Sequence, residues 1–365
     1  MTIRYGLIGS GMMGQEHIRN LNLLDGCEVT AIAEPDLGMR ELSQQTANSP
    51  IATYTNHHDM LANSDLDALV IVAPNHTHHS ILKDVLDSNL PILCEKPLCT
   101  TAADCGEIMT LAETRTAPLW VAMEYRYMPP VARLIDEVKQ GTVGQPRMMA
   151  IREHRFPFLE KIGDWNRFQA QTGGTLVEKC CHFWDLMRLV LQSDPVRVFA
   201  SGNMDVNFID ESYNGQQPDI LDNAFVILDF ENGSRGMLDL CMFAEGSYWQ
   251  EIVSVTGAQA RVDAKVPGPA RFTVDGKERH AEVEISHRAS KEVVTETIEV
   301  DHSILQAGDH HGSTFYQHQH FRDLILSGQN QPAVSMEDGY WSVLVGEAAE
   351  HSAKTGQAVY LKDFK

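Results

Sequence analysis

The chain has 365 residues, a length that predicts about two domains, each with its own hydrophobic core. Its 50 acidic and 29 basic side chains give a net charge of -21, with no Lys/Arg-rich run. This charge argues against nucleic acid or an anionic membrane surface as a partner, because both require clustered cations to neutralise phosphates.

No apolar run reaches the roughly 20 residues of a membrane-spanning helix, so we expect no membrane insertion. Residues 2–8 read as a strand and not as a secretory leader. The seven cysteines are scattered, apart from the adjacent Cys180 and Cys181. We therefore expect a cytoplasmic protein with reduced thiols.

From residue 3 to about residue 123, short β-branched runs alternate with amphipathic stretches of helical length. This alternation, with near-continuous apolar runs such as LVIVA at 69–73, predicts a parallel sheet covered by helices on both faces. The first domain is thus predicted to be doubly wound α/β. The predicted strands are 3–8, 28–33, 68–73, 91–94 and 119–123, with helices beginning near Met12, Gly38, Thr77 and Thr101.

After Pro129-Pro130 and a further helix that ends at Gly141, strand-like runs follow one another with turn residues between them. This pattern predicts an α+β domain with a large open, mostly antiparallel sheet. We place the boundary near Glu124, giving domains 1–123 and 124–365, with a C-terminal helix that is able to pack back on the first domain. The predicted strands are 148–153, 196–201, 224–230, 236–242, 252–256, 281–285 and 293–300, with helices near 175–191, 313–327 and 337–355.

The six residues GSGMMG follow the first predicted strand and open a helix. In this spacing Gly9 makes the tight turn, Gly11 lets the backbone approach a pyrophosphate, and Gly14 lets helix and strand pack closely. The helix N-terminus, with Met12 and Met13 in its first turn, supplies N–H groups and a positive dipole end for phosphates. We predict a dinucleotide site here, although any tight strand-to-helix turn can use glycines.

Glu34 ends the second predicted strand, at the distance from the glycine motif where an acidic residue is expected in such sites. A carboxylate there can accept hydrogen bonds from the ribose hydroxyls and would repel a 2′-phosphate. Pro35 and Asp36 follow, and neither offers a cation to hold such a phosphate. The sequence therefore favours NAD over NADP.

Two further segments, PNHTH and EKP, follow the strands at 68–73 and 91–94. Ligands of an open α/β sheet bind outside the carboxyl ends of its strands. Asn75 could hydrogen-bond the cofactor or equally cap the helix at Thr77. The Lys96 ammonium could stabilise an alkoxide or a carbonyl oxygen, the alternative being a surface salt bridge. The candidate cofactor residues of these segments are Pro74, Asn75, His78, Glu95 and Lys96.

The predicted helix over 175–191 is largely apolar, yet it carries Glu178, His182 and Asp185 on one face. A polar stripe on a buried helix needs partners or a chemical role, and we predict a catalytic one over a satisfied buried histidine. His182 suits proton transfer near neutral pH, and Glu178 could fix its tautomer. Cys180 and Cys181 point about 100° apart and cannot both meet one metal with His182, so we expect no metal.

Candidate substrate-binding residues lie in two loops. The stretch FPFLEKIGDWNRF holds Trp165, Asn166 and Arg167, an indole with amide and guanidinium donors that suits a pyranose; a simple hydrophobic loop anchor is equally possible. Further on, His310 or His311 precedes a helix at Ser313, and we favour His311 as a substrate residue.

This combination of motifs resembles the Gfo/Idh/MocA oxidoreductases. The residues that carry the resemblance are GSGMMG, PNHTH, Glu95-Lys96-Pro97, Arg126-Tyr127, Gly173-Gly174 with the stripe from Glu178 to Asp185, and the closing segment 313–361. The resemblance implies a Rossmann domain followed by an α/β domain whose open sheet commonly forms dimers or tetramers. It also implies NAD(P)-dependent oxidation or reduction of a sugar, polyol or related hydroxyl compound.

Carried over residue by residue, the resemblance makes Lys96 the lysine near the nicotinamide and the reacting hydroxyl, and His182 the acid/base. Glu178 stands where the family most often has Asp, and Cys180 where glycine is common, which suggests a subgroup with its own substrate. Lys179 and Arg126 join the predicted substrate-binding residues.

We therefore expect hydride transfer between a carbinol carbon and the nicotinamide, with His182 removing the proton, Lys96 stabilising the alkoxide and Glu178 orienting the imidazole. Two alternatives remain: a glycosidase or lyase-like enzyme that oxidises a sugar carbon transiently, and a non-catalytic NAD-binding regulator. The expected partners are a small sugar or polyol and a second copy of the chain, as a homodimer or homotetramer through the C-terminal sheet.

Overall fold

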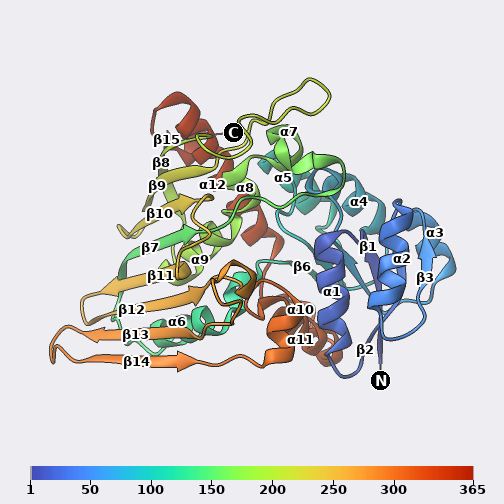
Figure 1. Ribbon diagram of the computed structural model, residues 1–365, viewed down its shortest axis with the longest axis horizontal. Coiled ribbons are helices and arrows are strands. Elements are labelled where there is room, and N and C mark those ends of the chain that lie inside the picture. Colours follow the sequence, from blue (N-terminus) through green and yellow to red (C-terminus); the bar gives the residue numbers. More distant parts are fainter. Residues whose placement is uncertain (1, 365) are drawn as a thin grey trace. The chain divides into compact units, whose positions relative to one another are not determined.

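The computed structural model describes residues 2–364, which divide into two compact units (Figure 1). The first unit takes Met1–Glu124, Lys161–Trp165 and His302–Val343. The second takes Tyr125–Glu160, Asn166–Asp301 and Leu344–Lys365. Each unit has its own sheet and its own core.

The first unit is built on a six-stranded parallel sheet in the order β3-β2-β1-β4-β5-β6. Its central strands are almost wholly buried, as expected for a sheet covered on both faces: five of the six residues of β1 and all four residues of β4 are buried. The predicted doubly wound α/β domain is confirmed. The strands are β1 (Ile3–Ile8), β2 (Cys27–Ala33), β3 (Ala52–Tyr54), β4 (Ala68–Ile71), β5 (Ile92–Cys94) and β6 (Leu119–Val121).

Three helices of this unit begin at residues whose side chains cap them. Asp36, Asn56 and Thr101 each accept a hydrogen bond from a backbone N–H in the first turn of the helix that follows. The helices are α1 (Met12–Asn22), α2 (Leu37–Thr46), α3 (His57–Asn63), α4 (His78–Val85), α5 (Ala102–Leu111), α10 (His302–Ala307) and α11 (Ser313–Ser327), with the 3-10 turn η1 (Asn75–Thr77). A second 3-10 turn, η2 (Glu124–Tyr127), begins at the last residue of this unit's first segment and continues into the second unit. Strand β3 and helix α3 are additions to the predicted elements.

The core of the first unit includes side chains from far along the chain. Phe321 of α11 is fully buried, with its ring centroid 6.4 Å from that of Tyr5 on β1 and 6.1 Å from that of Trp120 on β6. The backbone N–H of Val121 donates to the carbonyl of Val334. The segment His302–Val343 is therefore part of this unit's core and of its edge.

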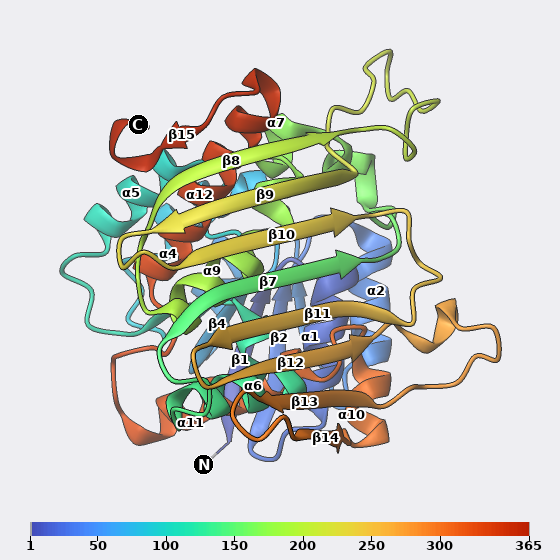
Figure 2. The same cartoon turned by 90° about the vertical axis from the view of Figure 1, so that its left-hand side faces the viewer.

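The second unit is built on a nine-stranded sheet in the order β14-β13-β12-β11-β7-β10-β9-β8-β15 (Figure 2). Strands β7 and β10 pair in parallel and the other neighbours pair antiparallel, so the predicted mostly antiparallel open sheet is confirmed. Strand β12 is an addition to the prediction. The strands are β7 (Pro146–His154), β8 (Pro195–Asn203), β9 (Asn223–Phe230), β10 (Arg235–Cys241), β11 (Trp249–Gly257), β12 (Ala260–Pro267), β13 (Ala281–His287), β14 (Val293–Ile298) and β15 (Val359–Tyr360).

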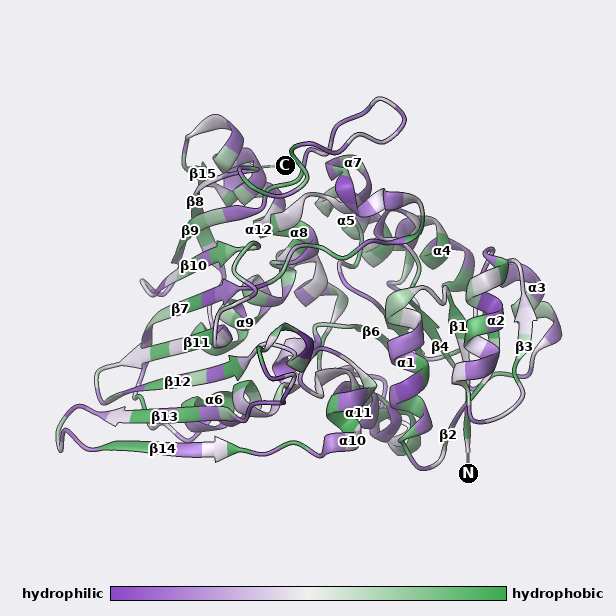
Figure 3. Ribbon diagram, in the orientation of Figure 1, coloured by the Kyte–Doolittle hydropathy of each residue, from purple (hydrophilic) through white to green (hydrophobic). Residues whose placement is uncertain are grey.

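One face of this sheet carries helices and the other does not (Figure 2). Along β9, Ala224, Val226 and Leu228 are buried while Phe225 and Ile227 are exposed, the alternation of a sheet with one covered face. Figure 3 shows the resulting change of hydropathy along the strands. The remaining elements are α6 (Pro129–Lys139), η3 (Ile162–Arg167), α7 (Gln169–Thr172), α8 (Thr175–Glu178), α9 (Cys181–Leu191), η4 (Ala270–Phe272), α12 (Met336–Thr355) and η5 (Leu361–Asp363).

The prediction of one helix over 175–191 is wrong in detail, because the helix breaks between α8 and α9. At the break, the carbonyl of Thr175 accepts two hydrogen bonds, one from the N–H of Lys179 and one from the N–H of Cys180. The second bond spans five residues, as in a π-turn, and such turns are frequent at functional sites. Across residues 2–364, no helix has the length and apolar character needed to cross a membrane.

Candidate functional site

The glycine loop joins β1 to α1 by a turn that only small residues permit. Gly9 has φ +93°, and a Cβ on it would lie 2.6 Å from the carbonyl oxygen of Val72. A Cβ on Gly14 would lie 3.0 Å from the carbonyl oxygen of Gly9, so helix and turn pack closely. Around Gly11 the space is open, because a Cβ there would meet no atom of residues 2–364 within 4 Å. Met12 and Met13 form the first turn of α1.

Glu34 follows β2 and holds the glycine loop in place. One carboxylate oxygen accepts a hydrogen bond from the N–H of Ser10 at 2.8 Å, and the other accepts from the N–H of Asp36 at 2.9 Å. Its side chain is 7% exposed. The structure thus brings the predicted acidic residue directly against the predicted phosphate loop.

Arg40 on α2 was missed by sequence reasoning, which considered only Pro35 and Asp36. Its Nη1 donates to the carbonyls of Glu34, at 2.5 Å, and of Pro35, at 2.8 Å. The signal lay in the helical period, since Arg40 stands one turn after the cap residue Asp36. A cation therefore lies beside the acidic residue.

The segment after β4 places two predicted cofactor residues, Asn75 and His78. Helix α4 begins at His78 and receives no side-chain cap, so the alternative role of Asn75 as its cap is not observed. Asn75 is buried, and within the described residues its Nδ2 has no hydrogen-bond partner. The ring nitrogens of His78 lie 2.8 Å from the carbonyl of Pro97 and 3.0 Å from that of Ala73, and burial lowers its pKa. His78 therefore ties together the segments that follow β4 and β5.

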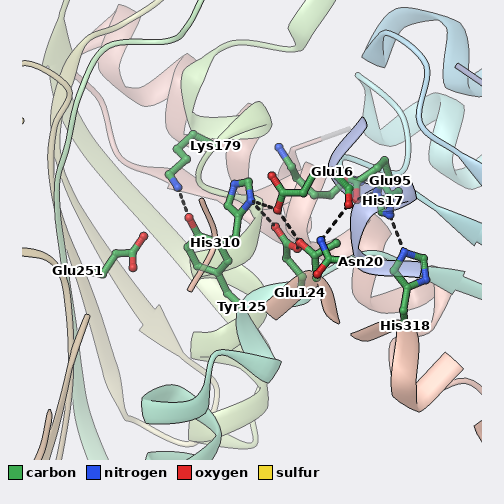
Figure 4. A network of polar contacts seen from close by, with 12 residues as sticks. Glu16, His17, Asn20, Glu95, Glu124, Tyr125, Lys179, Glu251, His310 and His318 are labelled. Carbon is green, nitrogen blue, oxygen red and sulfur yellow. Dashed lines mark hydrogen bonds and ion pairs between the residues drawn. The ribbon is translucent and has the colours of Figure 1, made fainter. Parts of the chain in front are cut away.

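Glu95 and Lys96 follow β5, as predicted, and Glu95 begins a buried chain of polar side chains. Its carboxylate lies 3.1 Å from Nε2 of His17, and Nδ1 of His17 lies 2.7 Å from Nε2 of His318 (Figure 4). Burial and the neighbouring His17 keep the pKa of His318 well below its usual range. Lys96 is partly exposed, directly after this buried carboxylate.

A second buried cluster in the first unit contains His310, which the sequence had offered as an alternative to His311. Nδ1 of His310 lies 2.9 Å from Glu16 and 3.7 Å from Glu124 (Figure 4). The Thr314 hydroxyl lies within hydrogen-bond distance of both carboxylates. Burial alone would raise the pKa of Glu16, but His310 outweighs it and the pKa is lowered, whereas burial raises the pKa of Glu124. His311, with φ +50°, is partly buried in the turn before α11.

In the second unit, His182 lies in the first turn of α9, four residues after Glu178, and both side chains are buried. The ring of Tyr125 stacks on the imidazole of His182, with centroids 4.0 Å apart and planes 7° apart. The stack fixes the plane of the imidazole. Tyr125 is a residue that sequence reasoning missed.

Asp185, the third member of the predicted stripe, forms an ion pair. Nε of Arg126 lies 2.6 Å from Oδ2 of Asp185, and Nη2 bonds the other carboxylate oxygen. Both side chains are buried. This bidentate pair joins η2 to α9.

Lys179, at the break between α8 and α9, is 3% exposed and lies among charged groups. Its Nζ is 2.9 Å from Oε1 of Glu153, and it donates a hydrogen bond to the Tyr125 hydroxyl (Figure 4). Glu251, directly opposite Glu153 in the sheet, completes the group. Sequence reasoning missed both glutamates, although each interrupts an inward-facing apolar row: Met149 and Ile151 on β7, Val253 and Val255 on β11.

Trp165, Asn166 and Arg167 are consecutive in η3, and each side chain has contacts of its own. Trp165 belongs to the first unit, where its ring lies 6.0 Å from that of His76. Asn166 and Arg167 belong to the second unit, where the Asn166 amide donates to the carbonyl of Leu159. The Arg167 guanidinium pairs with Glu211 at 3.3 Å and stacks over Phe208.

Among residues 2–364, two groups of potential metal-binding side chains lie on the surface of the first unit. They are His57, His58 and Asp84, and His79, Asp104 and Glu107. Glu107 of the second group also pairs with Lys83. None of these residues belongs to the segments described above.

The residues around the glycine loop fit a dinucleotide. Four features follow the carboxyl ends of β1, β2 and β4, which are neighbours in the sheet. They are the open space beside Gly11, the N-terminus of α1, the carboxylate of Glu34 and the Nδ2 of Asn75, which has no partner among residues 2–364. This is the edge at which α/β sheets bind nucleotides. The chemistry of the donors and acceptors matches phosphate, ribose and amide groups.

Comparison with known proteins gives matches along the whole chain. Residues 3–123 match the family model described as "Oxidoreductase family, NAD-binding Rossmann fold", and residues 135–361 match "Oxidoreductase family, C-terminal alpha/beta domain", both of the Gfo/Idh/MocA group. The rhizopine catabolism protein MocA of Rhizobium meliloti is 28% identical over 74% of this chain and 81% of its own length. The myo-inositol 2-dehydrogenase of Thermotoga maritima is 25% identical over 99% of both chains. The crystal structure of a probable dehydrogenase from Thermotoga maritima is 24% identical, covers 100% of both chains and has a TM-score of 0.78.

Proposed function

Because the chain belongs to the Gfo/Idh/MocA oxidoreductase family, we propose that it transfers hydride between NAD and a hydroxyl-bearing carbon of a sugar, polyol or sugar derivative. The observation that carries the proposal is the nucleotide-binding edge formed by the glycine loop, Glu34 and Asn75. The similarity to a myo-inositol 2-dehydrogenase over nearly the full length supports a polyhydroxylated substrate.

The chain's own residues supply the cofactor site. In this proposal the N–H groups at the start of α1 bind the pyrophosphate, Glu34 binds the ribose hydroxyls and Asn75 donates to the cofactor. Pro74, Glu95 and His78 shape the segments around them. Bound NAD supplies a hydride acceptor at its nicotinamide ring.

We propose NAD as the preferred cofactor because the Glu34 carboxylate would repel a 2′-phosphate. Arg40 is the competing influence, since an arginine at this place can accommodate such a phosphate. Its guanidinium, however, is directed to the carbonyls of Glu34 and Pro35. A carboxylate held by two backbone N–H groups is a fixed negative charge, and this favours NAD.

For the proton transfer we propose His182 as acid/base, with Glu178 orienting its imidazole and Lys96 stabilising the alkoxide. The stack on Tyr125 supports this role for His182, because a ring with a fixed plane presents its nitrogens in one direction. Lys96 follows the buried carboxylate of Glu95, which attracts its ammonium. An ammonium held near one position is suited to stabilising an alkoxide.

The other proposed substrate residues differ in whether their side chains already form ion pairs. Arg126, Arg167 and Lys179 have carboxylate partners within the second unit. Their proposed contribution is to shape the site and set its charge. Trp165, Asn166 and His311 keep the proposed role of contacting hydroxyl groups or a sugar face.

We also propose that the chain forms a homodimer or homotetramer through the uncovered face of the nine-stranded sheet. Phe199, Ile227 and Met237 are neighbours on β8, β9 and β10 and are 40%, 48% and 42% exposed. Large side chains in register on a sheet face form an apolar surface suited to a second copy.

The experiment is a panel of polyols, aldoses, uronates and glycosides, assayed by nicotinamide absorbance with NAD and NADP separately. We expect net NADH formation with at least one free polyol or sugar. His182→Ala and Lys96→Ala should each lower turnover by roughly 10²-fold or more, while His58→Ala, at an exposed histidine, should not. Aglycone release without net NADH, or tight NAD binding without any turnover, would contradict the proposal.

A further inference from the structure

Two buried acids face each other in the second unit. Glu153 on β7 and Glu251 on β11 are direct partners in the antiparallel register, and they are 0% and 2% exposed. Opposite residues of neighbouring strands bring their side chains within contact. Two carboxylates this close and this buried do not both ionise readily, so the pair is suited to hold one proton in common.

The surrounding charges decide which acid keeps the proton. Nζ of Lys179 lies 2.9 Å and Nη1 of Arg155 lies 3.5 Å from the same oxygen of Glu153. Glu251, by contrast, has an apolar residue, Val266, as its partner on β12. The side-chain amide of Gln250 donates a hydrogen bond to Oε1 of Glu251. Both cations therefore favour a negative charge on Glu153. Burial and the charge of Glu153 raise the pKa of Glu251 to about 8.

Lys179 connects this acid pair to the proposed catalytic histidine. Its ammonium donates to the Tyr125 hydroxyl, and its Nζ is 4.6 Å from the centroid of the Tyr125 ring. That ring stacks on His182 at 4.0 Å. A lysine held from one side by Glu153 thus fixes, from the other side, the aromatic ring that sets the plane of the imidazole.

We propose that Lys179 is a positioning residue for His182: anchored by the proton-sharing pair Glu153 and Glu251, it holds the Tyr125 ring against the imidazole. This inference rests on the proposed function and adds to it a group that regulates the position of His182. The proton on Glu251 is the control point, because its loss places a second negative charge beside Lys179. The ammonium is then drawn toward the acids and away from the Tyr125 hydroxyl.

The groups that act on this proton come from three elements. Glu153 and Arg155 lie on or just after β7, Lys179 lies between α8 and α9, and Gln250 lies on β11. Burial and the charge of Arg155 lower the pKa of Lys179, which weakens its hold on its own proton. Above a pH of about 8 the arrangement therefore contains one proton fewer, and the wild-type protein should lose activity there.

The first test is the pH profile of kcat and of kcat/KM from about pH 6 to about pH 10. Glu251→Gln mimics the protonated acid at every pH, so we expect wild-type kcat near pH 7 and loss of the alkaline limb. Glu284→Gln, a carboxylate on β13 that pairs with Lys265 and is only partly buried, is the matched control and should keep the limb. An unchanged alkaline limb in Glu251→Gln would overturn the proposal.

The second test is a double-mutant cycle between Tyr125→Phe and Lys179→Met. Each change removes the same hydroxyl–ammonium bond, so each should lower kcat by roughly 10-fold to 10²-fold and the double variant should be no worse than the single ones. The KM for NAD should not change. Lys179→Arg, which keeps a donor and a positive charge, should restore part of kcat. Additive losses would mean that the two residues act independently and would overturn the proposal.

The third measurement does not depend on turnover, so it separates this inference from the proposed function. Nitrogen-15 NMR of the His182 imidazole reports its protonation and tautomer, and infrared difference spectra report the protonated carboxyl of Glu251. We expect the imidazole signals to change in Tyr125→Phe and the carboxyl band to vanish in Glu251→Gln near pH 7. Should Lys179→Met fail to fold, Tyr125→Phe and Glu251→Gln still decide the question. Imidazole signals unmoved by Tyr125→Phe would overturn the inference even if the enzyme proves active.

Discussion

The carboxylate of Glu34 accepts a hydrogen bond from the backbone N–H of Ser10 at 2.8 Å, so the residue proposed to select the cofactor also holds the glycine loop. Glu34→Ala should therefore relax the preference for NAD, because the charge that repels a 2′-phosphate is removed. We expect the ratio of kcat/KM for NADP to that for NAD to rise by roughly 10-fold or more. The gain should shrink in Glu34→Ala/Arg40→Ala, since Arg40 is the cation beside this position. A ratio that stays unchanged in Glu34→Ala would contradict the NAD assignment.

Asn75→Ala should weaken NAD binding without weakening the fold. Within the described residues its Nδ2 has no hydrogen-bond partner, so the amide group stabilises no observed contact. Loss of one hydrogen bond to the cofactor should raise the Kd for NAD by roughly 10-fold, as measured by fluorescence titration. Asn89→Ala, at an exposed position, serves as the control. An unchanged Kd would remove Asn75 from the cofactor site.

Asp185→Ala should destabilise the second unit strongly. It would leave the buried guanidinium of Arg126 without its bidentate carboxylate, and breaking a buried ion pair typically costs about 3–5 kcal/mol. Denaturant unfolding measures the change in the free energy of unfolding. The double variant Arg126→Met/Asp185→Leu should recover most of this loss, because no charge is left buried. A loss below about 1 kcal/mol in Asp185→Ala would show that the pair is not needed for stability.

Glu350 on α12 should make stability depend on pH. Its carboxyl accepts the N–H of Leu176, and burial raises its pKa from 4.5 to about 7. A raised pKa means that the folded state binds the proton more tightly, so this contribution is present below pH 4.5 and is lost as the pH rises to about 7. Glu350→Gln should remove up to about 3 kcal/mol of this variation. Thermal unfolding across this pH range measures it, with the exposed Glu299→Gln as the control. An identical pH dependence in Glu350→Gln and wild type would contradict the prediction.

Ile227→Glu should shift the assembly toward monomers. Ile227 lies between Phe199 and Met237 on the uncovered face of the sheet, where a buried charge would oppose association. Light scattering after gel filtration gives the mass of each species. Thr295→Glu, on the edge strand β14, is the control. A wild-type monomer at micromolar concentration would contradict the proposed assembly.

Much of the fold could be predicted from the sequence, because the spacing of apolar residues in a strand differs clearly from their spacing in a helix. The apolar runs of β1, β2, β4 and β5 and the glycine loop identified the Rossmann sheet and its order of elements. Strand β3 has only three residues and gave too weak a signal. Strand β12 alternates regularly, but alanines occupy two of its buried positions, so its apolar character is low.

The site could be predicted only where it follows local rules. Glu34 could be predicted from its distance to the glycine motif. The stripe of Glu178, His182 and Asp185 could be predicted from helical spacing within one short segment. The break at Lys179 has no glycine or proline to announce it, and its partners Glu153 and Glu251 are distant in sequence. Pairing between separate strands decides which buried acids meet, and a single sequence does not encode that register visibly.

The return of His302–Val343 to the first unit has a consequence for how the protein is made. Glu16 of α1 is buried against His310 and Thr314, and Phe321 fills the core between Tyr5 and Trp120. A ribosome has to release most of the polypeptide before these partners exist. The first unit is thus begun first but completed only after most of the second unit has been made, so a nascent chain truncated after Glu124 would expose unfilled hydrophobic surface and attract chaperones.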